Sequence, residues 1–358
     1  MLSSGGLSGD SPSKIIVFMG NGMGFGQITA DYYYNPQSPY PLFPVSGLVT
    51  THPDGDKWVT DAAASSTALA TGMKVPPGSV GMTPEGEHLT TVLDVAHRRG
   101  KRTGIIATTS ITQPGPAAFT SHLQSWGREY EIAAQQAQTE VDVLLGGGLR
   151  FFESNAFADT NLISVMQSAG YEFVRTQSQL ETMPTESMEK LLGLFALEAL
   201  KQTSMRSLSL RLMTRKAVEI LDNDPDGFFL LVEGSQIDWR GHERSADGLV
   251  EELKDFGDAI RWALEYQNEH PELLIVVVGD HETGGVSLAE DANARGNVRI
   301  KFISGDHTAN VCPLFAKGKG AHHFQGFLDI QDVGKKLLIL SRSRTNQFLN
   351  RLFSRSDQ

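Results

Sequence analysis

Lys14-Ile-Ile-Val-Phe-Met19 is a continuous apolar run that leads directly into Gly20-Asn-Gly-Met-Gly24. An uninterrupted run of this length is typical of a strand that is buried on both faces, as in parallel sheets. The glycines that follow favour a tight turn into a helix. The stretch therefore predicts a strand–turn–helix unit of an α/β fold.

The same alternation of strand and helix patterns continues along the chain. Further buried strands are predicted at residues 103–108, 141–145, 228–232 and 273–278. Helices are predicted at residues 90–99, 129–140, 213–221 and 246–267. This order indicates a mainly parallel sheet covered by helices on both faces. Several of these strands end in Gly, Asp, Glu or His, and ligands of such sheets bind beyond the carboxyl ends of the strands.

The composition limits the classes of function. The chain has 358 residues and a formal net charge of −11, which argues against nucleic-acid binding because phosphates have no basic surface to meet. Bound metal ions could still supply positive charge for a phosphate ligand. Cys312 is the single cysteine, so no intramolecular disulfide forms. No apolar run approaches the roughly 20 residues that a membrane span needs.

We divide the chain into a flexible Gly/Ser-rich arm (1–13), one domain (14–340) and a polar C-terminal tail (341–358). Within the domain, residues 154–209 are interpreted as an irregular, lid-like insertion. The arm has no apolar core and does not read as a signal peptide, which leaves the compartment open.

Acidic residues and histidines follow two of the predicted strands. Val232-Glu-Gly-Ser-Gln-Ile-Asp-Trp-Arg-Gly-His242 places Glu233 at a strand end and puts Asp238 and His242 one helical turn apart. Val278-Gly-Asp-His-Glu-Thr-Gly-Gly285 contributes Asp280 and His281, and a third segment offers His307. Any one acid–histidine pair is usually a surface ion pair. Together, these mixed Asp and His ligands favour a zinc site.

These motifs, in this order, resemble those of the alkaline phosphatase family. Phe18-Met-Gly-Asn-Gly-Met-Gly24 and Val59-Thr-Asp-Ala-Ala-Ala-Ser-Ser-Thr-Ala-Leu-Ala-Thr-Gly72 share the resemblance, which extends from about Lys14 to Leu340. It implies a three-layer α/β/α sandwich and hydrolysis of phosphomonoesters through a phosphoserine. It also implies two zinc ions, a magnesium ion, a homodimer and a periplasmic or extracellular location.

By this resemblance, three residues form the first zinc site: Asp238, His242 and His307. The second site uses Asp280 and His281, together with the residues at positions 21 and 62. The family has Asp at position 21, whereas this chain has Asn21. A neutral amide removes one negative charge from a site for a dication, so we expect the second zinc to bind more weakly.

The magnesium ligands of the family are also largely replaced. Of their equivalents only Glu233 is charged, because the other positions carry Asn21, Gln113 and Gly115. We therefore expect no ordinary magnesium site.

Two residues that act on the phosphate in the family are absent here. The nucleophilic serine is replaced by Ala62, and a methyl group cannot attack phosphorus. The arginine that clamps the phosphate is replaced by Trp126, and the nearby Arg128 is displaced by two residues. Tryptophan cannot donate the paired hydrogen bonds of a guanidinium. Trp239, between two predicted ligands, is expected to pack beside the site.

Three hypotheses follow. We favour a pseudoenzyme that retains metal or phosphate-ligand binding and has strongly reduced or lost phosphatase activity, because several catalytic positions changed together. The alternative is an active hydrolase in which a zinc-bound hydroxide attacks a phosphate ester directly. A dinucleotide-binding protein, suggested by the glycines at 20–26, is set aside because their spacing does not match Gly-x-Gly-x-x-Gly.

Overall fold

The computed structural model of the chain describes residues 11–294 and 298–342. Residues 1–10 of the predicted arm and 343–358 of the predicted tail lie outside the described residues. None of the helices within the described ranges has the length and hydropathy of a membrane span.

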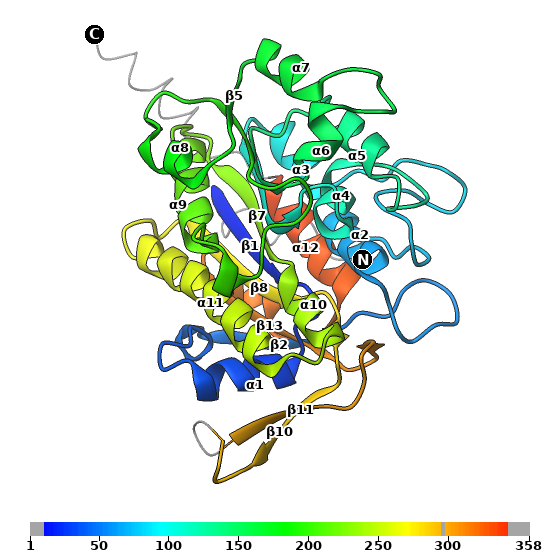
Figure 1. Cartoon of the computed structure of the whole chain (residues 1–358), viewed down its shortest axis with the longest axis vertical. Helices are drawn as coiled ribbons and strands as arrows, with labels where there is room; N and C mark the ends of the chain where they lie inside the picture. The colour runs from blue at the N-terminus through cyan, green and yellow to red at the C-terminus, as the bar shows by residue number, and fades with distance from the viewer. Residues whose placement is uncertain (1–10, 295–297, 343–358) are drawn as a thin grey trace.

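A large twisted sheet forms the centre of the molecule (Figure 1). Within the described residues it has ten strands, in the spatial order β14 (Gly326–Asp329), β2 (Val45–Thr50), β13 (Cys312–Gly318), β8 (Leu273–Gly279), β1 (Lys14–Gly20), β7 (Phe228–Gly234), β3 (Arg102–Ser110), β4 (Val143–Gly147), β6 (Lys190–Leu194) and β5 (Tyr171–Val174). β13 runs antiparallel to β2 and β8, whereas the other neighbours pair in parallel. The predicted mainly parallel sheet is confirmed.

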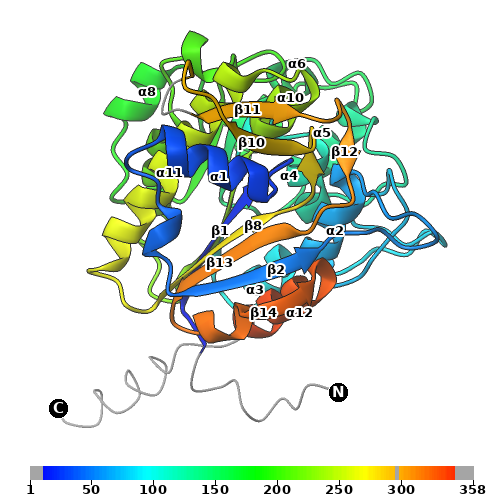
Figure 2. The ribbon, with the colours of Figure 1, turned by 90° about the horizontal axis from the view of Figure 1, so that it is seen from below.

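Helices cover both faces of this sheet. Figure 2 shows α1 (Phe25–Tyr34) and α11 (Ala246–Gln267) on one side, and α12 (Ile330–Ser341) on the other. The remaining helices are α2 (Ala62–Thr71), α3 (Val92–His97), α4 (Pro114–Thr120), α5 (Glu129–Gln136), α6 (Leu149–Glu153), α7 (Leu162–Ser168), α8 (Gln177–Thr182), α9 (Leu210–Leu221) and α10 (Gln236–His242). Alternate residues of β1 belong to two different cores, Ile15 and Val17 to one and Ile16 and Phe18 to the other. The chain is therefore a three-layer α/β/α sandwich.

The segment 154–209 is more regular than the sequence analysis expects. β6 pairs in parallel with β4, and β5 pairs in parallel with β6, so the segment supplies the edge of the central sheet. The segment thus contains two α-helices and two strands where the sequence analysis expects an irregular, lid-like insertion. The two strands are short, four and five residues, which gives little periodic signal, and their pairing is decided by contact with β4.

A second difference concerns the helix predicted at 129–140. α5 ends at Gln136, with Ala137 as its C-terminal cap. The hydroxyl of Thr139 donates to the carbonyl of Gln136 at 2.8 Å, so the chain turns there and leads toward β4.

Asp31, on α1, provides a stability test that is independent of the candidate site. Its side chain is buried, and burial raises its pKa to about 6. Because the folded chain holds its proton more tightly than the unfolded chain, stability falls as pH rises from about 4 to about 6. Asp31→Asn is therefore expected to raise the free energy of unfolding by about 1–2 kcal/mol at pH 8, with little gain at pH 4.

The measurement is urea unfolding of both proteins at the two pH values. Asp332→Asn, at a half-exposed position on α12, is the matched control and should change neither value. Equal pH dependence in wild type and Asp31→Asn would show that the Asp31 carboxyl does not carry the effect.

Candidate metal and phosphate site

Three elements bring the first group of predicted ligands together. Asp238 and His242 lie on α10, directly after β7, and β12 (His307–Thr308) pairs antiparallel with β9 (Glu282–Thr283). The Nε2 atoms of His242 and His307 each lie 3.4 Å from Asp238 Oδ1. These two nitrogens are 3.2 Å from each other. One carboxylate and two imidazoles thus converge from parts of the chain that are far apart in sequence.

Backbone carbonyls fix the orientation of both imidazoles. His242 Nδ1–H donates to the carbonyl of Gly305 at 2.6 Å, and His307 Nδ1–H donates to the carbonyl of Thr60 at 2.9 Å. With the Nδ1 proton so engaged, Nε2 either carries a second proton, which it donates to Asp238, or offers its lone pair to a cation. Two such lone pairs at hydrogen-bond distance repel each other unless a proton or a cation lies between them.

Asp280 and His281 follow β8 and lie against the first group. Single ligand atoms of Asp238, His281 and His307 all lie within 4.8 Å of one another. The hydroxyl of Thr283 connects them, since it donates to Asp238 Oδ1 and accepts from His281 Nδ1 at 3.2 Å. Asp280 Oδ1 accepts hydrogen bonds from the backbone N–H groups of Gly22 and His281. The donor sets that the family resemblance assigns to two metal ions are therefore adjacent.

The environment pushes the pKa values of these groups in different directions. Burial raises the pKa of Asp238, but hydrogen bonds from His242 and His307 outweigh it, so the net pKa lies well below the ordinary value. The hydrogen bond to Asp238 raises the pKa of His242 to about 9. Burial lowers the pKa of His281 to about 3 and raises that of Asp280 well above its usual range. Asp238 is thus the fixed negative charge around which the imidazoles gather.

Some buried polar atoms around Asp280 lack a hydrogen-bond partner among the described residues. These are Asn21 Oδ1, Asp280 Oδ2 and His281 Nε2, although the last two atoms lie 3.5 Å apart. Buried polar atoms are normally hydrogen-bonded, because leaving one unpaired costs about 1–3 kcal/mol. All three are atoms that can coordinate a cation, and carboxylate oxygen and imidazole nitrogen suit zinc. The residues present therefore fit a metal ion, with Asn21 offering a neutral amide oxygen.

The surroundings of Glu233 do not fit a magnesium site. Its Oε1 accepts from Asn21 Nδ2 at 2.9 Å, and its Oε2 accepts from the Ser235 hydroxyl at 2.8 Å. A Cβ added at Gly115 would lie 2.3 Å from Glu233 Oε1, so the glycine is packed directly against the carboxylate. Burial raises the pKa of Glu233 to about 7. Magnesium requires near-octahedral oxygen ligation, and here an amide N–H occupies one side of the carboxylate.

A cavity of about 250 Å³ opens beside the histidines. The residues that line it include Asn21, Ala62, Trp126, Asp238, Trp239 and His307. Ala62 is the first residue of α2, whose N-cap is Asp61. Arg128 pairs with Glu131 at the start of α5 and is not among the residues lining the cavity. The structure thus places the predicted nucleophile position and the predicted arginine position at one cavity. Ala62 and Trp126 lie there in place of a serine and an arginine.

Two structural residues of the site escaped the sequence analysis, although both lie inside a quoted motif. Thr283 connects Asp238 and His281, as described above. Glu282 is buried and accepts hydrogen bonds from Gln27, Gly285, Val286 and Thr308. It therefore ties the turn after His281 to the strand that carries His307. Both residues directly follow the predicted ligand pair in Asp-His-Glu-Thr, and this position in the sequence could have indicated them.

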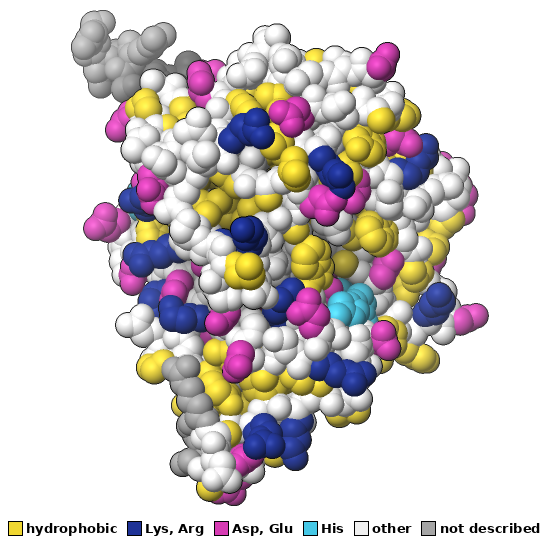
Figure 3. All heavy atoms as spheres, viewed as in Figure 1, with side chains coloured by type: hydrophobic (Ala, Val, Ile, Leu, Met, Phe, Trp, Pro, Cys, Tyr) yellow, Lys and Arg dark blue, Asp and Glu magenta, His cyan; other side chains and the backbone are white. Residues whose placement is uncertain are grey.

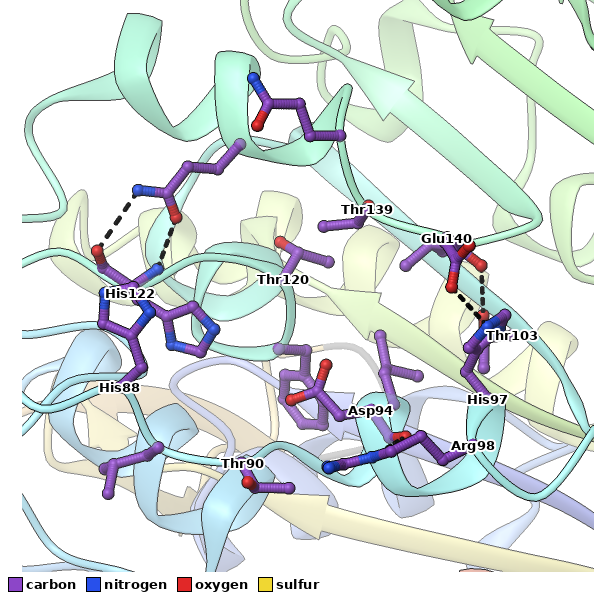
Figure 4. A pocket seen from close by; sticks show the side chains of 16 residues that line it. His88, Thr90, Asp94, His97, Arg98, Thr103, Thr120, His122, Thr139 and Glu140 are labelled. Atoms are coloured by element: carbon purple, nitrogen blue, oxygen red, sulfur yellow. Dashed lines mark hydrogen bonds and ion pairs between the residues drawn. The ribbon is translucent and has the colours of Figure 1, made fainter. Parts of the chain in front are cut away.

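A larger cavity lies elsewhere, between α3, α4 and the segment after α5 (Figure 4). It has a volume of about 740 Å³, and His88 and His122 stack at one end with ring centroids 4.5 Å apart. His97 and Glu140 form an ion pair at the other end. None of the residues predicted to bind metal lines this cavity. Cavity volume alone would therefore indicate a different site from the one at which the predicted ligands converge.

Comparison with known proteins places this geometry in a family. A family model described as alkaline phosphatase matches residues 13–301. The chain belongs to the alkaline phosphatase family. It is 35% identical to alkaline phosphatase 4 of Bacillus subtilis (strain 168) over 303 residues, which are 79% of this chain and 64% of that relative. It is 29% identical to the alkaline phosphatase of Escherichia coli (strain K12), covering 90% of this chain and 85% of that relative. The chain thus spans less than two thirds of the Bacillus relative.

Solved structures of the family share the fold. The alkaline phosphatase of the Antarctic bacterium TAB5 is 30% identical, with a TM-score of 0.87, covering 93% of this chain and 99% of that one. A variant of the TAB5 enzyme, with a TM-score of 0.88, has Mg bound in its M3 site. The cold-active alkaline phosphatase of Shewanella sp. is 28% identical, with a TM-score of 0.83, covering 92% of this chain and 99% of that one. The predicted fold and family are confirmed.

Proposed function

We propose that this chain binds zinc through Asp238, His242 and His307 and holds a phosphate or phosphomonoester beside it, with phosphatase turnover strongly reduced or lost. The observation that carries the proposal is the cavity that Asp238 and His307 line together with Ala62. The ligand atoms converge, but the residue beside them offers only a methyl group. A covalent phosphoserine cannot form at this position.

Each group has a defined task in this proposal. Asp238 supplies negative charge for the cation, while Gly305 and Thr60 hold the two imidazoles with Nε2 facing inward. Zinc, when bound, would supply the positive charge that offsets a phosphate. Asp280 and His281 would hold a second zinc more weakly, because Asn21 contributes no charge.

We propose that no magnesium ion binds at Glu233, since Asn21 and Ser235 already satisfy both of its oxygens. A homodimer also stays a prediction, which rests on the family resemblance. Light scattering of the purified chain would decide it.

The test of function combines a zinc titration with an activity assay. By calorimetry, the chain is expected to bind about one zinc tightly. With zinc and magnesium added at alkaline pH, its kcat on a chromogenic phosphomonoester is expected to be at least about 10³-fold below that of the TAB5 enzyme. Purified protein is needed because traces of host phosphatase would mimic turnover.

The His307→Ala variant shows whether any activity that is found comes from a contaminant or from the protein itself. Residual turnover that persists in this variant comes from a contaminant and leaves the proposal intact. Robust turnover that disappears in the variant would overturn the loss of activity and establish a hydrolase that works without the serine. Absence of zinc binding would overturn the metal site itself.

A further inference from the structure

The cavity beside the proposed ligands has aromatic walls, and the described residues that line it include neither lysine nor arginine. Two indole groups line it, those of Trp126 and Trp239. Asp61 adds a carboxylate to the same cavity. The surface that faces a bound ligand is therefore mostly neutral or negative, apart from the histidine and metal groups.

Hydrogen bonds fix the backbone of Trp126 relative to Ala62. The N–H of Trp126 donates to the carbonyl of Gly78 at 3.0 Å, and the N–H of Gly78 donates to Asp61 Oδ2 at 2.7 Å. The other oxygen of Asp61 accepts from the N–H of Ala64 at 2.9 Å, which caps α2. The loop that carries Trp126 is thus attached to the helix end at which Ala62 lies.

Trp239 lines the cavity from the helix that carries two of the proposed ligands. It lies on α10 between Asp238 and His242, and it is half-buried. Figure 3 shows histidine at the surface where α10 lies in Figure 1, close to hydrophobic side chains. One indole is therefore held on the metal-binding helix and the other on the loop beside the helix end of Ala62.

The side chain of Trp126 lies partly outside the packed interior of the protein. It is 37% exposed and is not part of either large hydrophobic core. Large aromatic side chains stabilise a protein mainly through buried area, so a partly exposed indole at a cavity wall contributes little to folding. It is available for contact with a ligand.

From these observations we infer that the cavity selects phosphate and phosphonate ligands that carry an aryl group, with Trp126 as the residue that determines this specificity. The inference rests on the proposed function, since the phosphoryl group would lie toward the proposed zinc ligands. The ring of the ligand would then contact the indoles. A volume of about 250 Å³ suits a small aryl ester better than the drug-sized ligands of pockets of roughly 300–1,000 Å³.

The physical basis is the kind of contact that the side chain at position 126 makes with a ligand. An arginine would recognise the charge of the phosphoryl group, whereas the indole of Trp126 contacts a ring. A guanidinium would bind the phosphoryl oxygens of every ester equally well and would not distinguish their alcohol groups. An indole binds no oxyanion as a clamp, but an aromatic pair contributes about 0.5–1.5 kcal/mol beyond its buried area. Together with the buried area of the ring, this predicts about a tenfold preference for an aryl over a methyl ligand.

The test compares phenylphosphonate with methylphosphonate, which carry the same charge and have no ester bond to hydrolyse. Zinc binding is titrated first, and the Kd of each phosphonate is then measured by calorimetry on the zinc-loaded protein. We expect phenylphosphonate to bind about tenfold more tightly to the wild type. Trp126→Ala is expected to reduce this ratio to about one to three, because Trp239 remains.

Two further variants make the outcome decisive. Trp58→Ala removes a tryptophan that is 75% exposed and does not line the cavity, and it should leave the ratio unchanged. Trp126→Arg is expected to tighten methylphosphonate binding and lower the aryl preference, because a guanidinium pairs with the phosphoryl oxygens. Since position 126 is partly exposed, both substitutions there should be compatible with folding.

Each result has one meaning. Zinc binding with equal Kd values for the two phosphonates, or with neither phosphonate bound, overturns the inference and leaves the proposed metal site standing. A preference that survives Trp126→Ala unchanged shows that Trp126 does not determine it. Failure to bind zinc overturns the proposed function and the inference together.

Discussion

Asp238→Ala is expected to weaken zinc binding by about 10³-fold. Asp238 Oδ1 lies 3.4 Å from the Nε2 atoms of both His242 and His307, so it faces both imidazoles of the proposed site. Losing a partner that only orients a ligand costs 10–100-fold in affinity, and loss of a charged direct ligand should exceed that. Calorimetric titration of zinc at one fixed pH measures the change, with circular dichroism to show that the variant is folded.

The matched control is Asp306→Ala. Asp306 is an exposed carboxylate next to His307 in sequence, so its removal changes the local charge by the same amount. Zinc affinity in this variant is expected to stay within about threefold of the wild type, since exposed charges are screened by solvent. If the two variants lose affinity equally, zinc is attracted by the general negative field and is not held by Asp238.

The second large effect concerns stability and lies outside the site. Arg206 donates through Nη2 to Glu252 Oε2 at 2.9 Å and to Asp255 Oδ2 at 2.8 Å, and all three side chains are less than one tenth exposed. Asp255 also accepts from the N–H of Leu210 at the start of α9. The guanidinium therefore joins the end of the 154–209 segment to α11.

Arg206→Met is expected to lower the free energy of unfolding by about 3–5 kcal/mol, because it leaves two buried carboxylates without their cation. Burial by itself lowers the pKa of Arg206, but Glu252 and Asp255 raise it above its ordinary value, so the group is charged at every working pH. Urea unfolding followed by circular dichroism measures the loss.

Arg150→Met serves as the comparison. Arg150 pairs with Glu198, and both side chains are about half exposed or more, at 49% and 63%. A surface pair of this kind contributes about 0–1 kcal/mol. A loss in Arg206→Met no larger than that in Arg150→Met would show that the buried carboxylates find other partners or take up protons.

If both the low turnover and the aryl preference are found, the site is a binding site built on a catalytic scaffold. Ala62 and Trp126 would then belong together, since one removes the attacking oxygen and the other replaces a clamp for phosphate with a wall for a ring. The cavity that contains both is the structural reason for considering the two positions as one change.

Much of the fold followed from hydrophobic runs that are long and uninterrupted. The run at Lys14 predicts β1, and the helix predicted at 246–267 has the observed bounds, because its apolar residues recur at helical spacing over six turns. Short elements were less visible. β5 and β6 gave too few residues for a pattern, and only their pairing with β4 shows that they extend the sheet.

The residue types of the site were likewise predictable from motifs, but their geometry was not. The sequence by itself determined which carboxylates and imidazoles follow strand ends, and that Ala62 carries no nucleophilic oxygen, since these are properties of local order and of single side chains. Only the tertiary structure decided that His307 lies 3.2 Å from His242, that Asn21 donates to Glu233, and that Trp126 shares a cavity with Ala62. Such contacts join residues that are far apart in the sequence, 65 positions for His242 and His307 and 212 positions for Asn21 and Glu233. Their distances depend on how the layers pack around the sheet, which no local pattern encodes.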